Sequence, residues 1–231
     1  MKNIVTIDGP AGAGKSTVSR MVAKRLQILY LDTGAMYRAV ALQAEREGID
    51  IDDGERMRRL CQGLDLRFVT EGEEANLFMG GEDISSAIRS PEMDMLSSAV
   101  SAVKEVREAM TALQRKIGLK GGVVAEGRDM GTVVFPDARH KFFLTASAEV
   151  RAGRRYQERR VRGESVTREE VARELAKRDQ QDSERAIAPL LPARDAKIID
   201  TTLLNASEVV DMILAEVDVE NGVKGRKNGP W

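Results

Sequence analysis

A glycine-rich segment near the start of the chain has the residue types and spacing of a phosphate-binding loop. It fills the pattern G-x-x-x-x-G-K-[ST], in which glycines let backbone N–H groups turn toward phosphate oxygens that a Cβ atom would obstruct. We expect Lys15 to be an exposed side chain that reaches the β- and γ-phosphates of ATP, and Ser16 to place its hydroxyl on Mg²⁺. The predicted ATP-binding loop consists of Gly9, Pro10, Ala11, Gly12, Ala13, Gly14, Lys15, Ser16 and Thr17.

The residues around this loop predict the elements that hold it in place. Residues 3–8 form a short apolar run typical of a buried strand, and residues 16–26 carry apolar side chains at the spacing of one helix face. Strand, loop and helix therefore follow one another in the order that a phosphate-binding loop requires. The positive end of the helix would then face the phosphates.

Four further runs have the length and composition of buried strands, namely 28–32, 122–126, 140–145 and 197–200. Helical patterns separate them, as in a parallel sheet covered by helices on both faces. We therefore predict an α/β fold of the P-loop NTPase class, with a doubly wound five-stranded parallel sheet in a single domain over 1–231.

Two segments interrupt this alternation of strands and helices. Residues 64–79 have the pattern of a small antiparallel hairpin, which predicts a β insertion at about 60–100. Residues 151–165 form an arginine-rich helix and a glycine turn, and we expect them to act as a lid over bound ligand. The tail 221–231 is rich in glycine and lysine without periodicity, and we expect it to be disordered.

Polar turns follow two of the predicted strands, at the edge where ligands of open α/β sheets bind. Thr33, Tyr37 and Arg38 come after the second strand, and they either face a second ligand or form only a helix cap with a surface arginine. Arg128 and Asp129 come after the third, with glycines on either side. Two charged turns at adjacent strand ends favour a binding site over solvated loops.

A helical pattern over 171–185 begins apolar on one face and becomes charged at Arg178, Asp182 and Arg185. In isolation, a surface ion pair between Arg178 and Asp182 would be the preferred interpretation, but beside a phosphate-binding loop the stripe predicts the wall of a polar site. We expect some of the lid arginines to bind phosphate, Arg155 among them, and others to be merely solvated. The arginines of the lid are Arg151, Arg154, Arg155, Arg159, Arg160 and Arg162.

The composition argues against several classes of protein. With 32% charged residues, 4% aromatic residues and a net charge of −1, the chain lacks the basic field and stacking platforms of a nucleic-acid motor. No apolar run approaches the roughly 18 residues of a membrane span, no leader pattern is evident, and the single Cys61 indicates a reducing compartment. We expect a cytoplasmic protein with no membrane or nucleic-acid partner, and we expect a monomer.

The motifs together resemble those of the bacterial cytidylate (CMP/dCMP) kinases, a family of nucleoside monophosphate kinases. The resemblance rests on the phosphate-binding loop, on D-T-G-A-M-Y-R at 32–38, on E-G-R-D-M-G-T-V-V-F-P-D-A at 126–138 and on R-D-x-x-D-x-x-R-A-I-A-P-L at 178–190. It extends from Ile4 to about Leu214. The resemblance implies transfer of the γ-phosphoryl group of ATP to CMP or dCMP, with Mg²⁺ as the cofactor.

The resemblance also implies roles for individual residues. Cytosine contacts are implied for Ser98, Arg107 and Asp129, and sugar contacts for Arg178 and Asp182. The implied phosphate contacts, which with Lys15 form the predicted catalytic set, are Arg38, Arg128 and Arg185. The whole predicted CMP site consists of Thr33, Tyr37, Arg38, Ser98, Arg107, Arg128, Asp129, Arg178, Asp182 and Arg185.

The chemistry of a monophosphate acceptor suits this chain. Such an acceptor is largely dianionic at neutral pH, because its second pKa is near 6, so no general base is required. Catalysis then consists of in-line positioning and charge neutralisation. Two alternatives stay open, namely a kinase for a small-molecule hydroxyl with Asp32 as its base, and a nucleotide-dependent switch or binding protein. A GTPase is disfavoured because the nearest string to its guanine motif, at 176–179, lacks the first residue.

Overall fold

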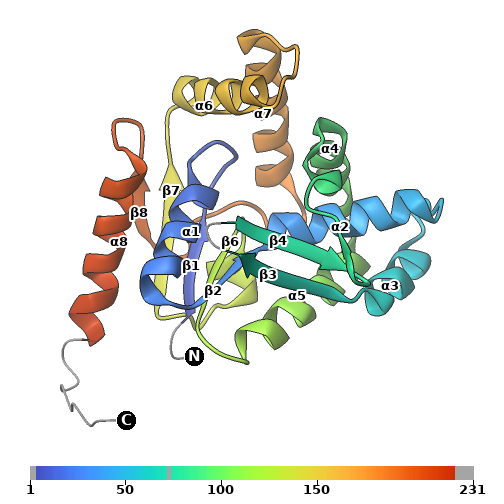
Figure 1. Ribbon diagram of the computed structural model, residues 1–231, viewed down its shortest axis with the longest axis horizontal. Helices are drawn as coiled ribbons and strands as arrows, with labels where there is room; N and C mark the ends of the chain where they lie inside the picture. The colour runs from blue at the N-terminus through green and yellow to red at the C-terminus, as the bar shows by residue number, and fades with distance from the viewer. Residues whose placement is uncertain (1–3, 72–73, 222–231) are drawn as a thin grey trace.

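A five-stranded parallel sheet with helices on both faces forms the body of the molecule (Figure 1). The structure is a computed structural model, and it describes residues 4–71 and 74–221. The strands are β1 (Ile4–Asp8), β2 (Leu29–Asp32), β6 (Val123–Gly127), β7 (His140–Thr145) and β8 (Lys197–Asp200). Their order is β2-β6-β1-β7-β8. The glycine-rich loop therefore leaves the central strand at the carboxyl edge of the sheet, and the predicted fold class is confirmed.

The central strands are apolar along their whole length because both faces of the sheet are buried. Along β1, Ile4 packs into one core, whereas Val5 and Ile7 pack into the other. The helices α1 (Lys15–Leu26) and α8 (Ala206–Asn221) cover the face of Val5 and Ile7. The opposite face is covered by α2 (Thr33–Arg46) and α5 (Lys104–Gly118), and α3 (Gly54–Gly63) packs against α5.

The predicted insertion is a small antiparallel sheet of three strands, β3 (Leu66–Glu71), β4 (Glu74–Met79) and β5 (Glu82–Asp83). A 3-10 turn, η1 (Ala87–Arg89), leads from it into α4 (Pro91–Val100). Ser90 caps α4, because its Oγ accepts a hydrogen bond from the Met93 N–H at 3.2 Å.

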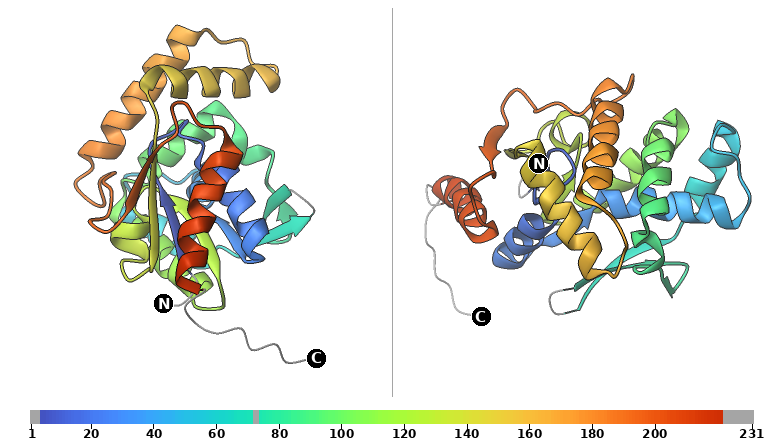
Figure 2. Two further views of the ribbon diagram at one scale, coloured as in Figure 1. Left: turned by 90° about the vertical axis from the view of Figure 1, so that its left-hand side faces the viewer. Right: turned by 90° about the horizontal axis from the view of Figure 1, so that it is seen from above.

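The arginine-rich segment folds as α6 (Ala148–Val161), which is followed by α7 (Arg168–Glu184). These two helices lie above the carboxyl edge of the sheet (Figures 1 and 2) and share a small core of their own, made by Ala152, Val171 and Leu175. The predicted helix over 171–185 was one residue too long. Arg185 has φ −53° and ψ 132°, so its backbone leaves the helix and turns the guanidinium back toward the sheet edge.

None of the described helices is both long enough and apolar enough to cross a bilayer. The tail predicted to be disordered begins at Asn221, the last residue of α8, and 222–231 lie outside the described residues.

Gly9 turns the chain out of β1 with φ +146°, and a Cβ atom there would lie 2.0 Å from the Leu144 carbonyl oxygen of β7. We expect Gly9→Ala to lower the free energy of unfolding by about 2 kcal/mol or more, because strand backbone cannot move away cheaply. Chemical denaturation would measure this. The control is Gly63→Ala in α3. A Cβ atom at this position meets nothing within 4 Å, and alanine favours a helix more than glycine does. Equal stability of the two variants would contradict the prediction.

Candidate functional site

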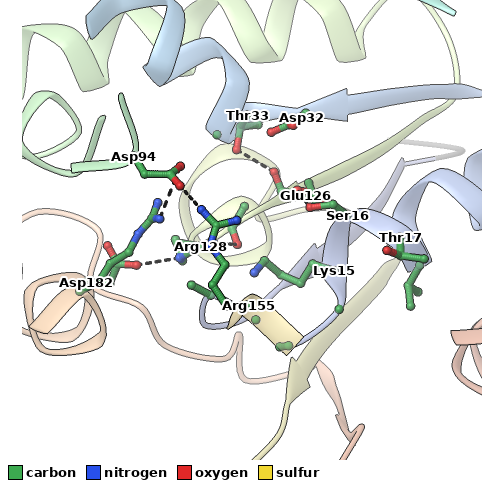
Figure 3. A pocket seen from close by; sticks show the side chains of 18 of the residues that line it. Lys15, Ser16, Thr17, Asp32, Thr33, Asp94, Glu126, Arg128, Arg155 and Asp182 are labelled. Atoms are coloured by element: carbon green, nitrogen blue, oxygen red, sulfur yellow. Dashed lines mark hydrogen bonds and ion pairs between the residues drawn. The ribbon is translucent and has the colours of Figure 1, made fainter. Parts of the chain in front are cut away.

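A pocket of about 680 Å³ opens at the carboxyl edge of the sheet, between the glycine-rich loop, α4, α6 and α7 (Figure 3). Eleven basic side chains line it against six acidic ones, so the pocket carries a net positive charge. Volume and charge together fit a ligand with several phosphate groups.

The pocket brings together almost all of the predicted site residues. Gly9 and Pro10 do not line it, because Gly9 packs against Leu144 and the Pro10 carbonyl accepts a hydrogen bond from Lys15. The predicted residues that line the pocket are Ala11, Gly12, Ala13, Gly14, Lys15, Ser16, Thr17, Thr33, Tyr37, Arg38, Ser98, Arg107, Arg128, Asp129, Arg155, Arg178, Asp182 and Arg185.

Lys15 lies beneath the loop rather than in solvent. Only 6% of the residue is exposed, so the prediction of an exposed lysine was wrong, and its Nζ donates to the Pro10 carbonyl at 2.7 Å. Burial, and then the neighbouring Arg128, lower the pKa of Lys15. A phosphate ligand would favour the charged ammonium, since an opposite charge close by offsets the cost of burial.

Ser16 and Glu126 offer oxygen atoms on the floor of the pocket. The Ser16 hydroxyl donates to Glu126 Oε1 at 2.8 Å, whereas Glu126 Oε2 is buried without a hydrogen-bond partner among the described residues. Burial and the nearby Asp32 raise the pKa of Glu126. These donors fit Mg²⁺, which proteins hold through one or two carboxylates together with substrate phosphates. Across 4–71 and 74–221, no group of three or more His, Cys, Asp or Glu forms a complete metal cage.

Arg128 and Asp182 form the central ion pair of the pocket (Figure 3). Arg128 Nε donates to Asp182 Oδ2 at 2.7 Å, and Arg185 Nη1 lies 4.0 Å from Asp182 Oδ1. Burial opposes ionisation of Asp182, but the charges of Arg128, Arg178 and Arg185 outweigh it and lower the pKa of Asp182. Asp182 is therefore an ionised carboxylate that can accept hydrogen bonds from donor groups of a ligand.

Arg107 and Asp129 form a second ion pair deeper in the pocket, with exposed fractions of 3% and 2%. Arg107 Nη1 also donates to the Ser101 carbonyl at 3.1 Å, and its guanidinium lies over the Tyr37 ring, 5.7 Å from the centroid. The pair thus presents one buried acceptor and one buried donor side by side. Ser98, predicted beside them, lines the same pocket, and its hydroxyl donates to Gln181 at 3.4 Å.

The start of α2 satisfies both interpretations that the sequence left open. Asp32 Oδ1 caps the helix by accepting from the Ala35 N–H at 2.8 Å, and the Thr33 hydroxyl donates to the Glu126 carbonyl at 2.7 Å. Arg38 nevertheless lines the pocket, at 3.4 Å from Asp32 Oδ2. The segment is therefore a helix cap that also directs an arginine into the site.

Several buried polar atoms of the pocket have no hydrogen-bond partner among the described residues. They are the Tyr37 hydroxyl and the Nε atoms of Arg38, Arg178 and Arg185. Folded proteins rarely leave such donors unpaired. Oxygen atoms of a bound ligand would satisfy these donors.

The lid arginines divide into two groups. Arg154, Arg155 and Arg162 line the pocket. Arg159 instead pairs with Glu164 and with Glu174 of α7. The first group can meet phosphate, whereas Arg159 stabilises the α6–α7 pair.

Arg151 fixes the first turn of α6 to the glycine-rich loop. Its Nη1 donates to the Ala11 carbonyl at 3.2 Å and to Asp179 of α7 at 2.6 Å. The contact is close, because a Cβ atom on Gly12 would lie 2.8 Å from the Arg151 carbonyl oxygen. Gly12 therefore serves the packing of the lid as well as the curvature of the loop.

Asp8 is a positioning residue that was not predicted from the sequence. Its two carboxylate oxygens accept the N–H groups of Met130 and Gly131 at 2.9 and 2.8 Å, at the start of the π-helical turn η2 (Met130–Val134). This clip holds the turn that carries Arg128 and Asp129. The only signal in the sequence was an acid at the end of an otherwise apolar strand.

A glycine-rich loop on the central strand, with a basic pocket between that loop and the helices α6 and α7, defines a P-loop phosphotransferase. A family model described as cytidylate kinase matches residues 5–219, so the chain belongs to the cytidylate kinase family. The family resemblance inferred from the sequence motifs is therefore confirmed.

Individual relatives agree with the family match. A cytidylate kinase of Citrifermentans bemidjiense is 51% identical over 214 residues, which cover 93% of this chain and 92% of that protein. A cytidylate kinase of Geobacter sp. (strain M21) is 53% identical over 210 residues, with 91% and 90% covered. An uncharacterized protein from Eubacterium ventriosum has a similar fold, with a TM-score of 0.54, 13% identity and coverage of 94% and 99%.

Burial raises the pKa of Asp8 from 3.8 to about 7, against the opposing effect of its two backbone hydrogen bonds. The folded protein therefore binds this proton more tightly than the unfolded chain. The resulting stabilisation is complete below pH 3.8 and is lost as the pH rises to about 7.

We expect the wild type to lose stability relative to Asp8→Asn between these pH values, at roughly 1 kcal/mol per pH unit. Urea unfolding of both proteins at a series of pH values measures the difference in their free energies of unfolding. The contributions of the other titrating groups are common to both proteins and cancel in this difference. Parallel pH dependence of the two proteins would refute the shift.

Proposed function

We propose that the chain transfers the γ-phosphoryl group of ATP to CMP or dCMP, giving ADP and CDP or dCDP. The observation that carries the proposal is a single pocket that holds both the glycine-rich loop and the buried Arg107–Asp129 pair. The loop would bind the triphosphate, and the pair would bind the cytosine. The basic wall between them, which includes Arg38, Arg128 and Arg185, would receive the acceptor phosphate and stabilise the transferred group.

The reaction needs no general base, since a monophosphate acceptor is already largely dianionic. This agrees with the state of Asp32, whose two oxygens face the Ala35 N–H and Arg38 and whose first task is to cap α2. A kinase for a hydroxyl acceptor, which would need Asp32 as a free base, is therefore not favoured. Closure of α6 and α7 over the pocket would keep water from the γ-phosphate.

A nucleotide kinase requires a metal ion with its nucleotide, and we propose Mg²⁺. Ser16 and Glu126 would hold it, and the ion would supply neutralisation of charge on the triphosphate. Lys15 would act beside it as a fixed cation whose buried stem cannot turn away from the loop.

Base selectivity follows from the hydrogen-bonding pattern of the Arg107–Asp129 pair. Cytosine offers an amino donor at N4 and acceptors at N3 and O2, whereas uracil offers an O4 acceptor and an N3–H donor in the corresponding places. Asp129 would accept from the cytosine amino group while Arg107 donates to N3 or O2. UMP would place like groups opposite one another, at a cost of roughly 1–3 kcal/mol for each unpaired group.

A turnover assay with ATP and a panel of monophosphates tests the proposed activity. We expect CMP and dCMP to be phosphorylated in strong preference to UMP, and Asp129→Asn to narrow the CMP-to-UMP ratio of kcat/KM, because an amide can donate to uracil O4. Equal use of UMP by the wild type, or an unchanged ratio in the variant, would overturn the account of selectivity. Turnover of none of the monophosphates would overturn the proposed activity itself.

Lys15→Met tests the loop with a side chain that preserves the buried stem. We expect phosphoryl transfer to fall on the order of 10³-fold, since one charged clamp on the transferred group is lost. The melting temperature should change little, and it serves as the control for folding. Turnover close to that of the wild type would remove Lys15 from the catalytic set.

A further inference from the structure

Asp94, in the first turn of α4, contacts arginines from three other helices. Figure 3 shows it beside Arg155. Its Oδ2 accepts a hydrogen bond from Arg155 Nη2 of α6. Its Oδ1 lies 3.7 Å from Arg38 Nη1 of α2 and 3.9 Å from Arg178 Nη1 of α7. One carboxylate therefore contacts cations from the core, from the lid and from the helix that follows the lid.

Three guanidinium groups so close together repel one another, and most of each side chain is out of water. Burial and the charge of Arg128 lower the pKa of Arg178 to about 10, and Asp94 opposes that shift. For Arg155, Asp94 is the first attractive charge against the effect of burial, and the pKa of Arg155 is raised. Asp94 thus offsets part of the repulsion that would otherwise drive these arginines apart.

The arginines that contact Asp94 keep hydrogen-bond donors available for a ligand. A guanidinium has five N–H donors in a fixed plane, and the Nε atoms of Arg38 and Arg178 are buried without a partner among the described residues. Three positive charges against one negative charge leave a surplus that suits a phosphate group. The cluster can therefore bind phosphate while Asp94 remains in place.

We propose that Asp94 is a positioning residue that draws Arg155 of the lid to Arg38 and Arg178 on the acceptor side. This proposal rests on the transfer reaction proposed above. Donor-side and acceptor-side arginines then meet the transferred phosphoryl group from a common point. The lid helix carries its arginine to the site only when α6 lies over α4, so Asp94 couples the position of the lid to the chemistry.

A purely structural role for Asp94 would come from the helix itself. An acid in the first turn of a helix favours the positive end of the helix dipole by about 0.3–1 kcal/mol. Glu92 lies in the same first turn, is exposed, and forms no ion pair among the described residues, so it offers the dipole effect without the arginines. Glu92→Gln is therefore the matched control for Asp94→Asn.

The test is a double-mutant cycle in the CMP kinase reaction, with Asp94→Asn, Arg155→Ala and the combined variant. We expect Asp94→Asn to lower kcat by about 10- to 100-fold, because a misplaced charged group costs rate rather than donor binding. The KM for ATP should change less than threefold. The combined variant should be about as slow as Arg155→Ala alone, since Asp94 acts through Arg155. Asp94→Glu should recover part of the lost kcat, and Glu92→Gln should match the wild type.

The outcomes separate the two proposals. A wild type that turns over CMP, together with additive effects in the cycle or an unchanged kcat in Asp94→Asn, would overturn the role of Asp94 and leave the kinase activity standing. An inactive wild type would overturn the proposed activity, and the role of Asp94 with it. Melting temperatures identify a variant that fails to fold, and Asp94→Glu then decides the question, because it keeps the charge. No recovery by that variant would count against the proposal.

Discussion

The constraint on which the site depends is the close approach of like charges. A pocket that binds polyphosphates must concentrate cations, and eleven basic side chains line this one. Carboxylates placed among them make the arrangement stable, each at a different depth: Asp94 near the lid, Asp182 in the centre and Asp129 beneath. Because a buried guanidinium is costly unless it is paired, each acid fixes the direction of an arginine as well as its charge.

The parallel sheet makes this arrangement possible, since it brings the ends of distant segments to one edge. β1, β2 and β6 are neighbours, so the glycine-rich loop, the start of α2 and the turn after β6 meet although 94 residues separate Asp32 from Glu126 in sequence. Asp8 then joins β1 to η2 through two backbone hydrogen bonds. The site is therefore held by strand ends and their hydrogen bonds, while α6 and α7 have only a small core of their own.

The sheet, its strands and the motif residues could be predicted because they depend on local patterns, namely apolar runs, helical spacing and glycine spacing. The remaining features depend on contacts between distant segments. Nothing local distinguishes Asp94 from Glu92, since both are acids in the first turn of one helix. Only the arginines that α2, α6 and α7 bring to α4 make Asp94 different. The burial of Lys15 was missed because the loop pattern defines the backbone path and not the depth of the side chain. The end of α7 before Arg185 depends likewise on contacts outside the helix, including the bond from Arg185 to the Ala188 carbonyl at 2.6 Å.

The contact between Gly12 and the first turn of α6 has a mechanical consequence. Arg151 fixes that end of the helix to the loop and to α7, so any rotation of α6 has its fulcrum there. With a rise of 1.5 Å per residue, Arg155 lies only about 6 Å along the axis from this point, and Arg162 about 16 Å. The same angular swing therefore moves the outer arginine more than twice as far as the inner one. A rotation of α6 about Arg151 therefore displaces Arg155 only slightly, whereas it displaces Arg162, at the far end of the helix, by a larger distance.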